Sequence, residues 1–153
     1  MKPVLFLRVA SILTLLLCLG HSMGRPWTPD TTPRGLALVA EMQAYSFDVM
    51  GFSRSYYDFY EGFGLSCSVG MLLAAVLMWQ LATMAKTDAR ATRPMLTAIF
   101  LTFAGYLVLD WFYFFTAPLV LTTPVVVLLG VALALSGRAS SASTNPPQSV
   151  QNG

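Results

Sequence analysis

Charged side chains are scarce in this sequence: only 10% of its 153 residues are Asp, Glu, Lys or Arg, and 56% are hydrophobic. Soluble domains carry roughly 25% charged residues, so this composition excludes an ordinary soluble domain and indicates a single membrane domain. The net charge of +2 is small and dispersed along the chain. The chain lacks a basic patch that would follow a phosphate backbone, and we therefore expect no nucleic acid among its partners.

Residues that bind metals or carry out catalysis are also few. The single histidine is His21, and the two cysteines, Cys18 and Cys67, lie in apolar segments outside any C-x-x-C pair. This pattern predicts buried free thiols rather than a zinc or thioredoxin-type redox site, although a disulfide stays open. The P-loop, G-x-S-x-G and H-E-x-x-H motifs are all missing. We expect no cofactor and no metal, and the sequence identifies no catalytic residue.

Long apolar runs are what the sequence has instead. Residues 94–137 contain one charged side chain, Asp110, and would form roughly 66 Å of helix, enough for two bilayer cores. Prolines near the middle of this run predict a hairpin of two spans, about 94–115 and 118–136. Pro124 is expected to kink the second span, because a helix that began there would be too short to cross the bilayer.

Two further spans precede this hairpin. Residues 62–85 contain no charge and form the clearest single span, whereas residues 3–20 are apolar but interrupted by Arg8. The first segment has two interpretations: a retained span in which Arg8 extends to the headgroups, or a cleaved signal peptide. We favour the retained span. The predicted fold is all-α, an integral membrane four-helix bundle of residues 1–137 followed by a disordered tail, 138–153.

The basic residues predict the orientation of these spans. They lie before the first span or near its start, between the second and third, and after the fourth: Lys2, Arg8, Lys86, Arg90, Arg93 and Arg138. The positive-inside rule places this side in the cytoplasm, so we expect both termini there and the protein in the cell (inner) membrane. The segment between the first two spans, residues 21–61, carries a net negative charge and is expected outside.

We expect this outer segment to be amphipathic and to lie at the membrane interface. After a proline-rich opening, residues 35–60 contain no proline and can be helical, which suits a short helix that rests on the bilayer surface or caps the bundle. Three apolar residues at spacing three would share one side of it: Leu36, Val39 and Met42. Aromatic residues crowd positions 52–63 and 111–115. Both groups are typical of the aromatic belts at a membrane interface.

Five polar residues form the candidate functional cluster: His21, Arg54, Asp58, Glu61 and Asp110. Arg54, Asp58 and Glu61 share one face if their stretch is helical, and a solvated charge face is the simpler account of them. Asp110 would lie near the outer headgroups, where pairing with an outer arginine competes with a functional role. If folding brings His21 to the carboxylates, the cluster would be able to bind a cation, relay a proton or hold a polar headgroup.

Small residues recur at intervals of four in two of the predicted spans: Ser66, Gly70 and Ala74 in one, and Gly130 and Ala134 in the other. Ridges of this kind let membrane helices approach closely and pack through van der Waals contact. We expect these ridges to pack helices within the chain rather than to form a dimer face.

The chain carries Gly20-His21 at the end of the first span, WTP at 27–29 and GFSRSYYDFYEGFG at 51–64. With these motifs it resembles an uncharacterised bacterial family of small four-span integral membrane proteins, over about residues 1–136. The resemblance implies that the first span is retained, and it assigns no function. In span count the chain is also similar to DoxX-like four-helix proteins, in architecture only.

These features favour a non-enzymatic accessory protein that interacts with lipid or a partner through its outer segment. Its expected partner is the lipid bilayer, together with a membrane protein or further copies of the chain. One alternative is a small proton- or ion-coupled transporter or channel that uses Asp110 and the outer carboxylates. Another is a membrane enzyme in which His21 acts as acid or base.

Overall fold

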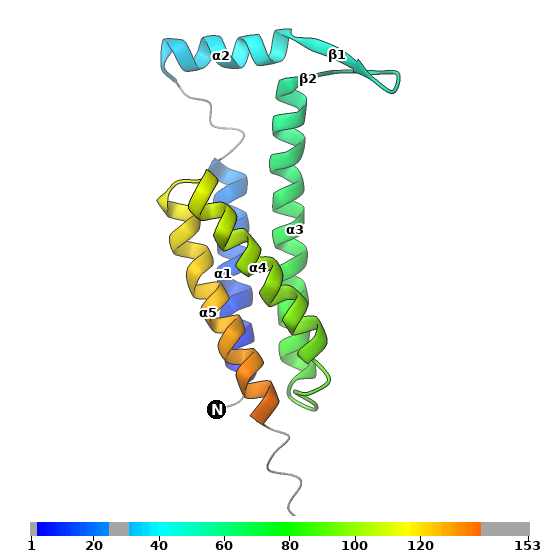
Figure 1. Ribbon diagram of the computed structural model, residues 1–153, viewed down its shortest axis with the longest axis vertical. Helices are drawn as coiled ribbons and strands as arrows, with labels where there is room; N and C mark the ends of the chain where they lie inside the picture. The colour runs from blue at the N-terminus through cyan, green and yellow to red at the C-terminus, as the bar shows by residue number, and fades with distance from the viewer. Residues whose placement is uncertain (1–2, 25–30, 139–153) are drawn as a thin grey trace, which may run out of the picture. The chain divides into compact units, whose positions relative to one another are not determined.

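The computed structural model describes residues 3–24 and 31–138. The WTP turn at 27–29 and the predicted disordered tail beyond Arg138 lie outside these described residues. The described chain forms five α-helices and one β-hairpin (Figure 1), in this order: α1 Pro3–Gly24, α2 Pro33–Ala44, β1 Ser46–Val49, β2 Phe52–Ser55, α3 Tyr56–Met84, α4 Arg93–Tyr113 and α5 Thr116–Arg138. The all-α fold class is therefore confirmed, with one small hairpin added to it.

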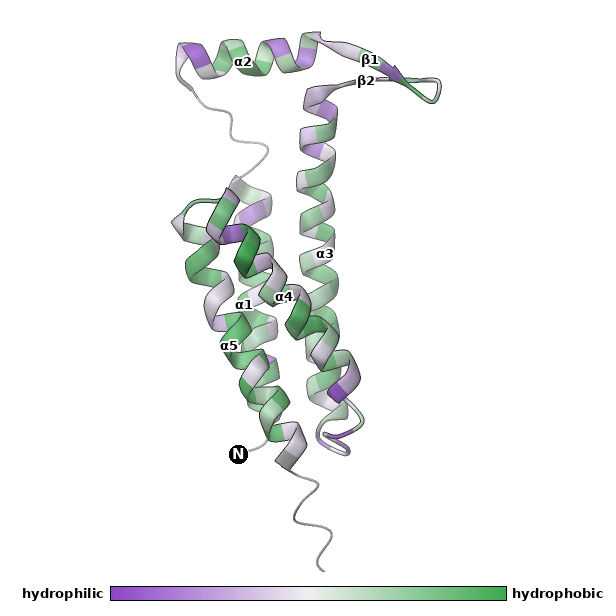
Figure 2. Ribbon diagram, in the orientation of Figure 1, coloured by the Kyte–Doolittle hydropathy of each residue, from purple (hydrophilic) through white to green (hydrophobic). Residues whose placement is uncertain are grey.

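Four of the described helices, α1, α3, α4 and α5, are long and apolar enough to cross a bilayer. They match the four predicted spans and support a multi-pass membrane protein. Figure 2 shows apolar residues along most of each of these helices and more hydrophilic ones in α2, the hairpin and the turns. α5 begins at Thr116 and continues through Pro124, so Pro124 lies inside the helix, as expected, and does not start it.

The outer segment contains a short helix, as expected, but within the stretch 35–60, which the sequence allows to be helical, residues 46–55 form a β-hairpin. α2 is capped by Thr32, whose Oγ1 accepts a hydrogen bond from Gly35 N at 3.1 Å, and it ends at Ala44. The hairpin follows, and α3 starts directly after it at Tyr56. Tyr, Phe and Ser occur in strands as well as in helices, so composition does not separate the two here. The turn between the strands decides the pairing.

The chain divides into two compact units, which are described separately. The described residues of the hairpin unit are 14–24 and 31–74, with α2, the β-hairpin, the end of α1 and the first part of α3. Those of the helical unit are 3–13 and 75–138, with the start of α1, the end of α3, α4 and α5.

In the helical unit, α4 and α5 run antiparallel and side by side (Figure 1). The buried residues of α4 follow at spacings of three and four and then seven: Leu96, Ile99, Phe103 and Asp110. Those of α5 alternate between three and four: Thr122, Val125, Leu129, Ala132 and Ser136. This period of 3.5 residues is that of left-handed coiled-coil packing, which is common between membrane helices. The helices approach closely at Gly130, where a Cβ would lie 3.4 Å from Phe100 Cε2.

The end of α3 and the start of α1 follow the same rule within the helical unit. Ala75, Met78 and Ala82 of α3 are buried at spacings of three and four, and Leu7 and Ser11 of α1 are buried four residues apart. The Ser11 hydroxyl donates to the Ala75 carbonyl at 2.7 Å. A serine hydroxyl reaches the backbone of a neighbouring helix only when the two helices are close. The small side chains of Ser11 and Ala75 allow this close approach.

Gly130→Leu is expected to lower the melting temperature of the detergent-purified protein, because the larger side chain would enter the space of the Phe100 ring. Overpacking of this kind costs about 1–3 kcal/mol. Gly70→Leu is the matched control, since it also replaces a helical glycine but no described atom lies within 4 Å of its Cβ position. Thermal unfolding followed by circular dichroism compares the two. Equal melting temperatures would contradict the packing of α4 against α5.

Candidate functional site

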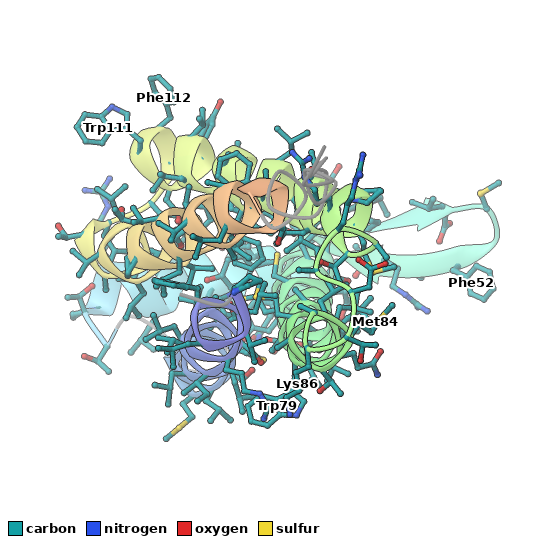
Figure 3. The ribbon with its side chains drawn as sticks, turned by 90° about the horizontal axis from the view of Figure 1, so that it is seen from below. Phe52, Trp79, Met84, Lys86, Trp111 and Phe112 are labelled. Atoms are coloured by element: carbon teal, nitrogen blue, oxygen red, sulfur yellow. The ribbon has the colours of Figure 1, made fainter. Side chains whose placement is uncertain are left out.

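The β-hairpin presents apolar side chains at its turn. β1 pairs antiparallel with β2, and the pair Val49 and Phe52 closes the ladder. The turn residues Met50 and Gly51 both have positive φ, 51° and 87°, as a type I′ turn requires. Met50 is 94% exposed and Phe52 63% exposed. Figure 3 shows Phe52 extending outward from the hairpin.

Five aromatic rings form a continuous chain between the hairpin and α3: Tyr45, Phe47, Tyr56, Phe59 and Phe63. The centroid of Phe47 lies 5.0 Å from that of Tyr56 and 5.6 Å from that of Phe59, and Phe59 continues to Phe63 at 6.2 Å. These separations are those of favourable ring pairs. The rings therefore fix β1 on the first turns of α3, and part of the predicted aromatic belt is a packed cluster.

Ser55 and Asp58 cap the start of α3 reciprocally. Ser55 N donates to Asp58 Oδ2 at 2.7 Å, and Asp58 N donates to Ser55 Oγ at 3.1 Å, which is a capping box with Asp in the acidic position. Arg54 lies in β2, and its Nη1 donates to the Ser53 carbonyl at 2.7 Å. Arg54 therefore does not share a helical face with Asp58 and Glu61. Asp58 serves the helix start, and Glu61 is half-buried in α3.

His21 joins a hydrogen-bonded network between the end of α1 and α3. Its Nδ1 is 3.0 Å from Ser68 Oγ, and Ser68 Oγ is 2.9 Å from Ser22 Oγ. Ser22 Oγ donates to the Cys18 carbonyl at 2.8 Å, and the Cys18 thiol donates to the Ser68 carbonyl at 3.3 Å.

The hydrogen bond from the Ser22 hydroxyl to the Cys18 carbonyl determines which groups donate in the rest of this network. A carbonyl only accepts, so the single Ser22 hydroxyl proton points to Cys18 O. Ser68 must then donate to Ser22, and His21 must donate to Ser68 from Nδ1. This order satisfies every contact, and in neutral His21 it leaves the lone pair on Nε2.

Folding thus brings His21 to Ser68 rather than to a carboxylate. Ser68 follows Glu61 by about 10 Å and Asp58 by about 15 Å along α3, and no hydrogen bond joins His21 to either residue in the described part of the chain. Charge does not single out Ser68 or its partner Ser22. The available signal is the spacing of small polar residues on α1: Ser11, Cys18 and Ser22 are seven and four residues apart.

Asp110 belongs to the helical unit, where it is one of the buried residues of α4. The residue is only 9% exposed, and its Oδ2 is buried without a hydrogen-bond partner among the described residues. Arg93 lies about 25 Å away along α4, beyond the reach of its side chain. The next residues, Trp111 and Phe112, are 70% and 73% exposed and point outward in Figure 3. A buried carboxylate without a partner is unfavourable by several kcal/mol, and it needs a partner or a proton.

The predicted small-residue ridges take different positions. Ser66 and Gly70 are exposed and Ala74 is half-buried, and the buried residues Met78 and Ala82 continue the same spacing along α3. Gly130 packs closely against α4, and Ala134 on the same helix is exposed.

The two thiols are free; Cys18 is buried, as expected, but Cys67 is exposed. Within residues 3–24 and 31–138, no group of three or more His, Cys, Asp or Glu side chains is placed to hold a metal ion.

Comparison with known proteins adds no identification: no protein-family model, curated protein or solved structure matches the chain. The resemblance to the bacterial four-span family, and the architectural likeness to DoxX-like proteins, stay predictions.

Ser68→Ala is expected to lower thermal stability by about 1–2 kcal/mol, because His21 and Ser22 both lose their partner. Ser66→Ala is the control, since that hydroxyl bonds only within its own helix, to Gly62 O. His21→Asn keeps a donor near the Nδ1 position and is expected to be more stable than His21→Gln, whose donor lies nearer Nε2. Thermal unfolding in detergent measures all four variants. Equal stability of the two His21 variants would contradict the donor order.

Proposed function

We propose that this protein is a multi-pass accessory protein of the cell (inner) membrane, without enzymatic activity, that binds a partner membrane protein through a recognition surface formed by α2 and the β-hairpin. The distribution of basic residues supports an orientation with both termini in the cytoplasm and this recognition surface outside.

The conformation of Met50 is the observation that carries this proposal. A left-handed backbone costs a residue with a Cβ about 1–2 kcal/mol, and type I′ turns strongly favour Asn, Asp or Gly. Met50 nevertheless has a φ of 51° and is 94% exposed. Its side chain contributes little to the packing of the hairpin. An apolar group in this conformation and at this exposure indicates contact with something outside the chain.

The remainder of the recognition surface has the mixed character of a protein interface. None of the twelve residues of α2, all of them described, is buried. Leu38 and Tyr45 are 62% and 60% exposed, and Arg34 and Glu41 are exposed on the same helix. Tyr, Met and Arg are enriched at protein interfaces. The ring cluster holds this surface at the start of α3, an apolar span, which favours a partner that also resides in the membrane.

Met50→Asn separates folding from recognition. Asn-Gly suits a type I′ turn better than Met-Gly, so the melting temperature is expected to hold or rise. Contact with the partner is expected to weaken, because the exposed apolar side chain is lost. The measurement is photo-crosslinking in the native membrane from a benzoylphenylalanine at position 52. A discrete protein adduct is expected in the wild type, and an adduct at least five times weaker in Met50→Asn.

The control for this experiment places the same crosslinker at Val69, which is 68% exposed within the apolar part of α3. Lipid adducts are expected there. An unchanged protein adduct in Met50→Asn would contradict the role of Met50. Lipid adducts alone at position 52 would make the outer segment a lipid-binding surface and overturn the protein partner.

A second function, a small proton- or ion-coupled transporter or channel, is favoured by the buried and unpaired Oδ2 of Asp110. Such carboxylates in membrane helices commonly mark ion pathways. An enzymatic role for His21 has less support, because its described partner is the Ser68 hydroxyl rather than a carboxylate.

Asp110→Asn tests this second function in proteoliposomes loaded with a pH-sensitive dye. If Asp110 couples ion movement, the wild type conducts protons or exchanges cations for them, and Asp110→Asn reduces the flux at least tenfold. Asp88→Asn is the control, because Asp88 Oδ1 accepts hydrogen bonds from the backbone N–H of Arg90 and Ala91 in an exposed turn, and an Asn oxygen can replace it. A wild-type flux no greater than that of empty vesicles would exclude the transporter.

A further inference from the structure

Arg8 is the only Lys, Arg, Asp or Glu residue in α1, an otherwise apolar helix long enough to span a bilayer. Its guanidinium carbon lies 3.9 Å from the centroid of the Trp79 ring on α3, within the helical unit. This distance is well inside the range of a cation–π contact, and a planar guanidinium stacks readily on an indole. The contact therefore holds the guanidinium in one place against α3.

The stacking leaves the hydrogen-bonding capacity of Arg8 unused. A guanidinium has five N–H donors, and in the described part of the chain none of the donors of Arg8 has an acceptor, although the cation lies over the ring of Trp79. Arg8 lies about 7 Å from the first residue of α1 along the helix axis. At this depth in a membrane span, near the boundary between headgroups and hydrocarbon, acceptors must come from lipid or from a polar partner.

The neighbouring charge at this end of α3 is also positive. Lys86 lies in the turn directly after α3, which ends at Met84, and Figure 3 shows Lys86 and Trp79 on the same side of this end of the helix. Lys86 and Arg93 are exposed. The nearby carboxylate, Asp88, is engaged by the backbone N–H of Arg90 and Ala91 at 2.9 and 3.1 Å. The charge of this surface thus suits an anion rather than a cation or a neutral group.

Apolar side chains flank Arg8 on the outside of α1. Leu5 and Ile12, three residues before and four residues after Arg8, lie on the same side of the helix and are 61% and 49% exposed. Trp79 is itself 43% exposed. The surface therefore combines an anion-binding group with an apolar strip that continues toward the middle of the helix. A free inorganic anion would gain no favourable contact with this apolar strip, whereas the acyl chain of a lipid would pack against it.

We propose that Arg8 and Trp79, with Lys86 beside them, form a binding site for the headgroup phosphate of an anionic glycerophospholipid. Arg8 donates two parallel N–H bonds from one edge of its guanidinium to phosphate oxygens, Trp79 holds the guanidinium in position by stacking on its face, and the acyl chains lie along Leu5 and Ile12. This site lies in the helical unit and does not depend on the recognition surface proposed above.

Native mass spectrometry of the full-length protein in detergent tests the site by titration with dioctanoyl phosphatidylglycerol. Dioctanoyl phosphatidylcholine serves as the zwitterionic lipid and inorganic phosphate as the free anion. We expect phosphatidylglycerol to bind at least ten times more tightly than phosphatidylcholine. Arg8→Gln should lose at least tenfold in affinity, and Arg8→Lys about threefold, because lysine keeps the charge without the planar pair of donors. Trp79→Leu should also lose affinity.

Arg54→Gln is the matched control, because Arg54 also lies over an aromatic ring, Phe52, at 5.6 Å, but has a backbone acceptor in Ser53 O. It should bind phosphatidylglycerol as the wild type does. Equal effects of Arg8→Gln and Arg54→Gln, or none from either, would overturn the site. Competition by inorganic phosphate at the affinity of the lipid would overturn the lipid assignment. If Arg8→Gln fails to fold, unchanged binding in both Arg8→Lys and Trp79→Leu overturns the proposal.

Discussion

Membrane helices that are apolar on every side gain little by burying apolar surface against each other, because lipid tails are as apolar as leucine. Close backbone approach and polar contacts must then decide which faces meet. The buried series of α1, α3 and α5 include small or weakly polar residues, whereas that of α4 consists of Leu96, Ile99, Phe103 and Asp110. Ser11 reaches the Ala75 carbonyl, and Thr122 and Ser136 bound the buried series of α5. Other large residues, such as Leu101, which is 61% exposed, lie on the outside, where lipid would cover them.

The two polar centres of the chain, the His21 network and Asp110, differ in whether their hydrogen-bonding groups have partners. Around His21 each hydroxyl and the imidazole donor has an acceptor, and the order of donors ends on a backbone carbonyl. A fully satisfied network of this type holds helices together and specifies their register. Asp110 is as buried as the core around it, yet one oxygen has no partner among the described residues. A satisfied network is explained by the fold alone, whereas an unsatisfied carboxylate is not.

The length and apolar character of the spans could be predicted, because about 20 apolar residues are needed to cross a bilayer whatever the packing. The inward faces could not be predicted from hydropathy, since Leu129, buried, and Val131, exposed, are equally apolar. The hairpin could not be predicted for another reason. Its turn is Met50-Gly51 rather than Asn-Gly, so the sequence lacks the strongest local signal of a hairpin turn. Charge indicates His21 as a candidate site residue but not Ser68, although Ser68 is the residue that His21 contacts.

Three residues depart from local physical preference without compensation in the described chain, and each departure indicates the chemistry of what is missing. Met50 keeps an apolar side chain in a backbone conformation that favours Asn or Gly, so its missing contact is apolar. Asp110 has a buried oxygen that accepts nothing, so its missing contact is a proton or a cation. Arg8 has donors without acceptors beside an indole, so its missing contact is an anion. Folded chains tolerate such local conflicts chiefly where function requires them. Since the three requirements differ in charge and polarity, no single ligand meets them all, and the bilayer, a partner protein and an ion have to be tested separately.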